Sequence, residues 1–178
     1  MKTMELYMIS DDRSIQNQIL VKNDQNHDIF LIIGRWGQLN DTLSLYTVTG
    51  RCLIRITQQT LSFFPTFQLT INQQSAGKIK KYPGFLGIGT PYYIVKKFNW
   101  VASGDFKTQH YTVTCGSQLI MTVDKALTSA GECSLLSIEK AHHAPLCCIL
   151  AVIIEHYAVN KNNEHLPAQR NTLQEANC

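Results

Sequence analysis

Short runs of alternating hydrophobic and polar residues occupy most of the chain, from residue 5 to about residue 138. Side chains of a strand point alternately to the two faces of a sheet, so this alternation is typical of strands with one buried face. Turn residues separate the runs, as in an antiparallel sheet or barrel. Examples are Leu43 and Leu45 in DTLSLYTVTG, Phe67, Leu69 and Ile71 in TFQLTIN, Tyr111 and Val113 in QHYTVTCG, and Leu119, Met121 and Val123 in QLIMTVD.

A weak internal repeat also indicates hairpins. A turn residue is followed by hydrophobic residues three and six positions later at Asn26, Gly50 and Gln73, which lie 24 and then 23 positions apart. Gly116 begins a later and less regular copy. Repetition at a nearly fixed period indicates one structural unit used several times, here a hairpin.

One continuous hydrophobic run stands apart from this pattern. The stretch AHHAPLCCILAVIIEHYAVN contains eleven consecutive apolar residues, from Ala144 to Ile154. The run exceeds the usual length of a strand, and Pro145 suits the first turn of a helix, so we expect a helix over residues 144–159. A helix that crosses a bilayer needs about 20 apolar residues, which this run does not supply. Because the run has no polar face, the rest of the protein must enclose it.

These two features predict a mostly β protein (α+β by count of element types), built as a closed antiparallel barrel around a single helix. Closure removes exposed strand edges, and a helix about 10 Å wide fits only inside a barrel wider than one filled by side chains. We expect one barrel domain over residues 1–160. The remaining segment, residues 161–178, is polar and lacks a hydrophobic stripe, so we expect it to be mobile.

The order of three phrases carries a resemblance to a known family. The phrases are GRWGQLNDTLSLYTVTGRCLIRITQQTLSFFPTFQLTI, FLGIGTPYYIVKKFNWVASGDFKTQHYTV and the terminal hydrophobic helix. In this order they resemble the LURP-one-related family, whose fold is like the C-terminal domain of tubby proteins and is regarded as related to phospholipid scramblases. The resemblance extends over about residues 4–160 and is to the bacterial type of member.

The resemblance implies a twelve-stranded barrel threaded by its C-terminal helix, with the hydrophobic run as the filling of the barrel. The family usually turns on glycine where this chain has Gln73, and usually has an aromatic residue where this chain has Cys133. The resemblance implies little chemistry, because bacterial members are largely without an assigned function. Phosphoinositide binding belongs to the tubby branch, whose specific motif is absent from this sequence.

Composition is consistent with a single soluble domain. The 178 residues are 44% hydrophobic, which is ordinary for a globular protein. The start, MKTMELYMISDDR, has no apolar segment of the kind found in secretory signals, so we expect a cytoplasmic protein. The six cysteines show no C-x-x-C spacing, and adjacent Cys147 and Cys148 suit a buried pair of free thiols in the helix.

Charge is distributed unevenly along the chain. Seven of the sixteen Lys and Arg residues and none of the thirteen Asp and Glu residues lie between Asp41 and Asp105. That segment therefore carries +7 and the remainder −4, a contrast that concerns binding partners more than fold.

Five lysines of this segment form the candidate binding site: Lys78, Lys80, Lys81, Lys96 and Lys97. The sequence SAGKIKKYPGFLGIGTPYYIVKKFNW predicts two strands joined by a Pro- and Gly-rich loop, with Lys78 near Lys96 and with Lys78 and Lys80 on one face. An anion placed between opposed lysines would relieve their repulsion. We therefore expect peripheral binding of anionic lipid headgroups, or of another phosphate-bearing ligand, with the loop residues Phe85, Leu86 and Ile88 dipping into the interface. The alternatives are a solvated basic face and a scaffold or protein-interaction domain without a small ligand.

Other kinds of chemistry have less support in the sequence. Asp105 and His110 could form an acid–base pair, but no nucleophile motif accompanies them, so we expect no enzyme, catalytic residue or cofactor. Adjacent His142 and His143 would point in different directions, and we expect no metal site. The small net charge of +3 makes nucleic acid an improbable partner. Glu155, near the end of a buried helix, needs a cation, a donor or water, and a structural partner at the barrel mouth is its simplest interpretation.

Overall fold

The computed structural model describes residues 3–10, 18–35, 38–60, 64–84, 89–129 and 131–163. Within these ranges, twelve strands precede one long helix, α1 (Ala144–Asn163). A short 3-10 helix, η2 (Lys96–Phe98), lies between the eighth and ninth strands, and a second, η3 (Ala141–His143), directly precedes α1. The strands are β1 (Met4–Ser10), β2 (Gln18–Asn23), β3 (Asp28–Gly34), β4 (Thr42–Thr47), β5 (Cys52–Gln58), β6 (Thr66–Ile71), β7 (Gln74–Tyr82), β8 (Tyr92–Val95), β9 (Trp100–Asp105), β10 (His110–Cys115), β11 (Gln118–Thr128) and β12 (Gly131–Ile138).

Each strand pairs with its neighbours in the sequence, and the last strand returns to the first. All pairs are antiparallel, and β1 pairs with β12 in the register Leu6 to Leu136, which closes the barrel. The expected closed, twelve-stranded antiparallel barrel is confirmed. Because the order of strands around the barrel follows the order in the chain, a stretch of sequence becomes a continuous stretch of barrel wall.

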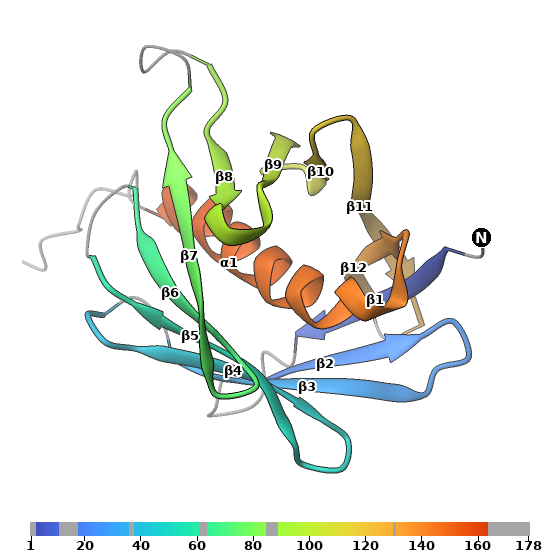
Figure 1. The fold of residues 1–178 in the computed structure, drawn as a ribbon. Helices are drawn as coiled ribbons and strands as arrows, with labels where there is room; N and C mark the ends of the chain where they lie inside the picture. Colours follow the sequence, from blue (N-terminus) through green and yellow to red (C-terminus); the bar gives the residue numbers. More distant parts are fainter. Residues whose placement is uncertain are drawn as a thin grey trace, which may run out of the picture.

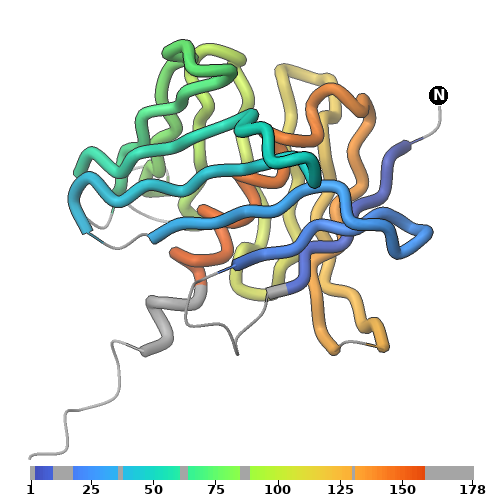
Figure 2. Tube along the Cα trace, turned by 90° about the horizontal axis from the view of Figure 1, so that it is seen from below, coloured from blue at the N-terminus to red at the C-terminus, as the bar shows by residue number. Residues whose placement is uncertain are grey.

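Helix α1 runs through the interior of this barrel (Figures 1 and 2). Every side chain from Cys147 to Ala151 is fully buried, and Val152, Ile153 and Ile154 are at most 2% exposed. The helix begins at Ala144, as the position of Pro145 indicates, and continues to Asn163, four residues beyond the expected end. No helix among the described residues is long and apolar enough to cross a membrane. The hydrophobic run is therefore the filling of the barrel.

Most strands show the expected alternation of buried and exposed residues, but β11 departs from it. The pairing of β10 with β11 shifts between Val113 and Thr114, which leaves Ile120 as an extra residue in β11. Ile120 and Met121 are both buried, whereas Leu119 is 36% exposed. The expectation that Leu119 faces inward with Met121 is wrong, because a β-bulge changes which face a residue occupies.

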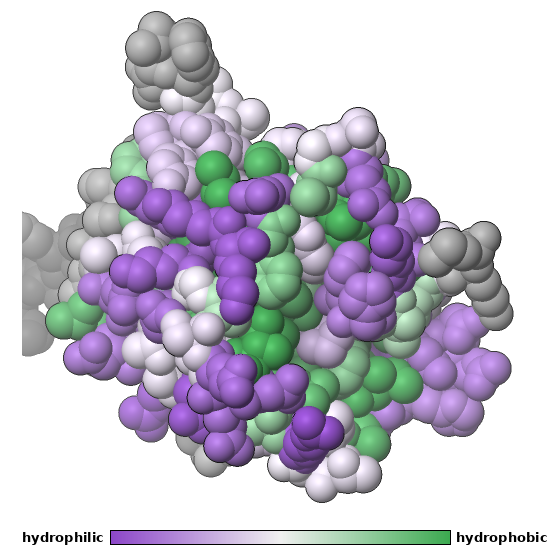
Figure 3. All heavy atoms as spheres, viewed as in Figure 1, coloured by the Kyte–Doolittle hydropathy of each residue, from purple (hydrophilic) through white to green (hydrophobic). Residues whose placement is uncertain are grey.

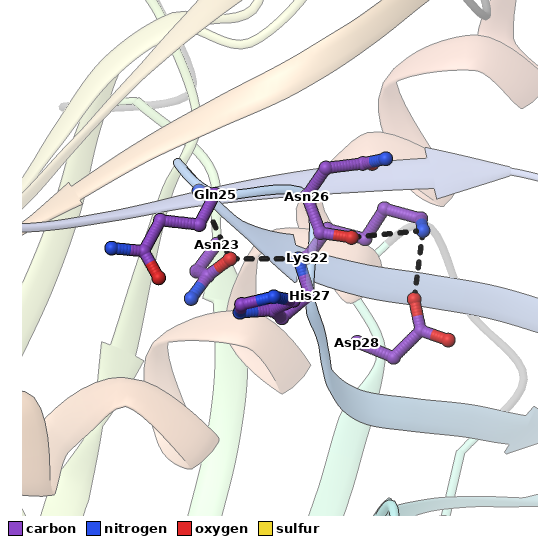
Figure 4. Close-up of polar contacts among 6 residues, drawn as sticks. All are labelled: Lys22, Asn23, Gln25, Asn26, His27 and Asp28. Atoms are coloured by element: carbon purple, nitrogen blue, oxygen red, sulfur yellow. Dashed lines mark hydrogen bonds and ion pairs between the residues drawn. The ribbon is translucent and has the colours of Figure 1, made fainter.

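The turn residues of the sequence repeat all adopt left-handed backbone conformations. The φ angles are 62° at Asn26, 82° at Gly50, 66° at Gln73 and 59° at Gly116. At the first of these turns, the Asn23 carboxamide oxygen accepts the backbone N–H groups of Gln25 and His27 at 3.1 and 2.8 Å (Figure 4). The repeat therefore does mark hairpin turns.

For the sites below, the mouth of the barrel at which α1 begins is called the first mouth, and the mouth at which it ends is called the second mouth. The turns η2 and η3 lie at the first mouth. The loop between β7 and β8 and the turn between β9 and β10 lie at the second mouth.

Candidate functional site

Four of the five candidate lysines lie on the outside of the barrel around β7 and η2. Lys78 and Lys80 share the outer face of β7, because Ile79 between them is fully buried. Ile79 of β7 pairs with Val95 of the antiparallel strand β8. Lys78, one residue before Ile79, therefore lies beside Lys96, one residue after Val95. Lys97 packs against β7, where its Cβ lies 3.0 Å from the position that a Cβ on Gly77 would occupy. The predicted proximity of Lys78 and Lys96 agrees with this register.

Aromatic residues accompany the lysines on this outer face. The Lys80 ammonium lies 4.9 Å from the ring centre of Tyr82, within cation–π distance. Tyr82 in turn stacks on Tyr92 of the neighbouring strand, with ring centres 5.4 Å apart. These contacts hold the stem of Lys80 against the barrel wall.

Lys81 does not belong to this group. Its side chain is only 4% exposed, and its ammonium lies 5.8 Å from the ring centre of Tyr93 and 5.7 Å from that of Tyr157 in α1. Its expected place among anion-binding surface lysines is wrong, because an odd-numbered position of β7 points into the barrel when Lys78 and Lys80 point out.

The lysines also do not all flank the loop between β7 and β8. Lys96 and Lys97 follow β8 at the first mouth, whereas that loop joins β7 to β8 at the other end of the strand pair (Figure 1). Phe85, Leu86 and Ile88, which were expected to dip into an interface, lie outside the described residues. The part of the candidate site that the structure describes is therefore the outer wall.

The charge asymmetry of the sequence becomes an asymmetry of the barrel wall. Asp41 immediately precedes β4 and Asp105 ends β9, so the segment without acidic residues forms six consecutive strands of the barrel. On its outer face, Arg55 of β5 hydrogen-bonds the Ser44 hydroxyl at 3.2 Å and remains exposed. This half of the wall is basic, with Asp105 at its far end, and β1, β3, β11 and β12 of the other half carry Glu5, Asp28, Asp124 and Glu132.

The Asp105 and His110 side chains do not form an acid–base pair. Asp105 accepts the backbone N–H groups of Lys107 and Thr108 at 3.0 and 3.3 Å, and the Thr108 hydrogen bonds lower the pKa of its carboxyl group. His110 instead meets Asp124, with 2.6 Å between Nδ1 and a carboxylate oxygen. Both side chains are exposed, at 81% and 45%, which is ordinary for a surface pair.

A small hydrophobic pocket of about 400 Å³ opens at the first mouth, between β5, β6 and the start of α1. Figure 3 shows hydrophobic atoms between hydrophilic ones near the middle of the face seen in Figure 1. His142 and His143 border the pocket, and their ring centres are 4.1 Å apart, so the expectation that they point in different directions is wrong. His143 packs edge-on to Trp100, and burial lowers its pKa. No group of three or more metal-ligating side chains exists among the described residues.

A larger and more polar cavity of about 620 Å³ lies at the second mouth. It is bordered by α1 at Glu155, by β12 at Cys133 and Ser134, and by the turn between β9 and β10. Burial raises the pKa of Glu155 to about 7, and a hydrogen bond from Ser134 opposes this shift. The sequence singled out Glu155 but gave no sign of the cavity, because residues far apart in the chain form its wall.

Fold and surface together define a class of protein: a closed antiparallel barrel filled by its C-terminal helix, with one basic half of its wall. No protein-family model matches the chain. The chain is 23% identical over 163 residues to YxjI of Bacillus subtilis (strain 168), an uncharacterised protein, covering 92% of this chain and 99% of YxjI. The X-ray structure of the Arabidopsis thaliana protein AT5G01750 matches with a TM-score of 0.55 at 9% identity, covering 89% of this chain and 92% of that one. The second likeness is one of fold alone.

Proposed function

We propose that this protein is a non-enzymatic barrel that binds anionic lipid headgroups peripherally through its basic wall. The residues that would contact the headgroups are Lys78, Lys80, Lys96 and Lys97. Lys81 is not part of the proposed site because it is buried. Binding through side chains alone is reversible, and no part of the barrel needs to enter the membrane.

The observation that carries this proposal is the separation of charge between the two halves of the barrel. The segment that forms the basic half has no Asp or Glu between Asp41 and Asp105, and Asp105, at the end of β9, instead accepts the backbone N–H groups of Lys107 and Thr108. Among the described residues, two lysines outside this segment form ion pairs: Lys22 with Asp28 and Lys125 with Glu132. Both pairs lie in the other half of the barrel. The four outer lysines are therefore free to meet anions.

The magnitude of the effect favours weak association. Each lysine near an anionic leaflet contributes about 1 kcal/mol, and salt screens this attraction over about 8–10 Å. Four lysines would then contribute several kcal/mol at low salt. A cytoplasmic location, expected from the sequence, belongs to the same proposal because the cytoplasmic leaflet carries the anionic lipids.

We further propose that the chain is a bacterial-type LURP-one-related protein. The barrel with its threaded helix, and similarity to the Bacillus subtilis protein over nearly the whole of both chains, support this assignment. The assignment leaves the ligand open, so the lipid proposal depends on the basic wall. The second candidate function is a scaffold or protein-interaction domain, which the same wall could serve.

Co-sedimentation with vesicles tests the proposal. We expect the wild type to pellet with vesicles of mixed phosphatidylcholine and phosphatidylserine at low salt, and to remain in the supernatant at high salt or with phosphatidylcholine alone. A variant with Lys78, Lys80, Lys96 and Lys97 all changed to Gln should lose most of this pelleting.

The matched control removes the same charge from the other half of the barrel. In it, Gln replaces Lys22, Lys107, Lys125 and Lys140, which all lie outside the acid-free segment. This control should pellet far more than the first variant. Equal pelleting of the two variants, or no pelleting of the wild type at low salt, would make the protein-interaction function the better one.

A further inference from the structure

The cavity at the second mouth is independent of the basic wall. Its border comes from five elements: Met8 on β1, the turn between β9 and β10, Lys125 on β11, Cys133 on β12 and Glu155 on α1. Its volume of about 620 Å³ is within the range of roughly 300–1,000 Å³ common to small-molecule sites. None of the four outer lysines borders it.

At this cavity, Glu155 holds an acceptor that the protein leaves unused. Its Oε1 atom is shielded from solvent and has no hydrogen-bond partner, while the Ser134 hydroxyl donates to the carboxyl group. A buried carboxyl oxygen without a hydrogen-bond donor costs stability. The fold therefore carries a cost that a suitable ligand would remove.

The other charges at the cavity are largely accounted for. Lys125 pairs with Glu132 at the rim, with 2.7 Å between ammonium and carboxylate, so this lysine already has a carboxylate partner other than Glu155. Phe106, which is 7% exposed, adds an aromatic surface to the same cavity. The titratable or charged groups around Glu155 on neighbouring elements are Lys107, Tyr111, Lys125, Glu132 and Cys133, and α1 adds His156 and Tyr157.

We propose that this cavity is a binding site for a small organic cation, a primary ammonium group, with Glu155 as its acceptor. An ammonium presents three N–H donors and forms a charge-assisted hydrogen bond with a carboxylate. The aromatic surface of Phe106 stabilises the same charge through a cation–π contact. A divalent metal ion fits less well, because calcium takes six to eight oxygen ligands and no group of three ligating side chains occurs among the described residues.

Titration with butylamine, followed by backbone amide NMR shifts, tests this site. We expect saturable shifts concentrated at Thr108, Cys133 and Ser134. Glu155→Gln keeps the shape of the side chain and removes its charge, and should abolish the shifts. Glu132→Gln, a carboxylate at the rim of the same cavity, is the matched control and should retain them.

The dependence on pH gives a second readout. Because burial raises the pKa of Glu155 to about 7, the carboxylate is mostly ionised at pH 8 and mostly protonated at pH 6. The affinity for butylamine should therefore fall about tenfold between those two values.

Three results would overturn the proposal. Butan-1-ol, which lacks the charge, would shift the same amides as strongly as butylamine. Glu155→Gln would respond like the wild type. Butylamine would cause no saturable shift at millimolar concentrations, in which case the cavity holds only water. None of these results bears on vesicle binding, so the two proposals fail separately.

Discussion

Gln73 occupies a backbone conformation that suits glycine. The turn between β6 and β7 has positive φ at both central residues, 47° at Asn72 and 66° at Gln73. Such turns match the twist of a hairpin, and Asn-Gly is their preferred sequence. A side chain in the left-handed region costs about 1–2 kcal/mol, part of which glycine returns as greater entropy in the unfolded state.

We therefore predict that Gln73→Gly raises the free energy of unfolding by about 0.5–1 kcal/mol, measured by urea denaturation. The neighbouring residue provides the control. Gln74 begins β7 and pairs with Ile71, so Gln74→Gly should lower the free energy of unfolding. If both changes have the same sign, conformation at the turn is not the cause.

Glu155 makes stability depend on pH in a direction opposite to that of most carboxylates. Its pKa is about 7 in the folded protein and 4.5 ordinarily, so the folded state binds its proton more tightly. Ionising this buried carboxyl group destabilises the folded protein. This destabilisation is absent below about pH 4.5, grows as the pH rises, and is fully present above about pH 7. The difference corresponds to roughly 3 kcal/mol at most.

Glu155→Gln should consequently stabilise the protein at pH 8 by up to roughly 3 kcal/mol and change little at pH 4.5. Burial lowers the pKa of the adjacent His156 to about 4, but this group titrates in both proteins and largely cancels in the comparison. Urea denaturation of the two proteins at several pH values measures the difference. A Gln variant that is less stable at pH 8 would show that the carboxylate has a partner in solution.

At the scale of the element, α1 tolerates no charge in its middle turns. Ile153 is 2% exposed and is surrounded by the barrel wall, so Ile153→Asp buries a carboxylate without a partner. We predict loss of the cooperative thermal transition. Val48, which is 63% exposed in the turn after β4, supplies the control, and Val48→Asp should unfold normally. A folded Ile153→Asp protein would mean that α1 is not enclosed.

The reactivity of the two thiols of α1 tests in the wild-type protein whether the barrel encloses the helix. Cys147 and Cys148 are fully buried, and burial raises the pKa of both thiols. Since the thiolate is the reactive form, both should resist a thiol reagent in the native protein and react after unfolding. Peptide mapping by mass spectrometry distinguishes them from Cys52, which is partly exposed and should react first. Rapid native labelling of Cys147 and Cys148 would contradict the threaded barrel.

At the scale of the whole molecule, the sequence predicts the architecture better than the site. Alternation and one unbroken hydrophobic run sufficed for a barrel around a helix, while the number of strands came from the family resemblance. Leu119 was misplaced because a bulge shifts the alternation without a signature in composition. Lys81 was misplaced because the prediction counted all lysines of the segment together. Lys81 directly follows Lys80 in a strand, so its side chain had to point to the opposite face of the sheet.

The cavity beside Glu155 could not be predicted in this way. Its wall comes from β1, β11, β12, α1 and the turn between β9 and β10, which meet only after the barrel closes. No periodicity along the chain reports such a meeting. Closure is thus the step that creates both the cavity and the enclosure of α1.

Closure depends on β1, and its removal is the last prediction. Deleting residues 1–10 removes the strand between β12 and β2, together with the buried side chains of Leu6 and Met8, each worth about 1.5–3 kcal/mol of burial. It also leaves two unpaired edges, which favour aggregation. We expect the shortened protein to lose cooperative unfolding and to sediment as aggregates, whereas a protein lacking only residues 1–3, which precede β1, should behave as the wild type. If deletion of residues 1–10 instead leaves a monomer with an unchanged melting temperature, an open sheet is enough to hold α1, and the pairing of β1 with β12 contributes little to stability.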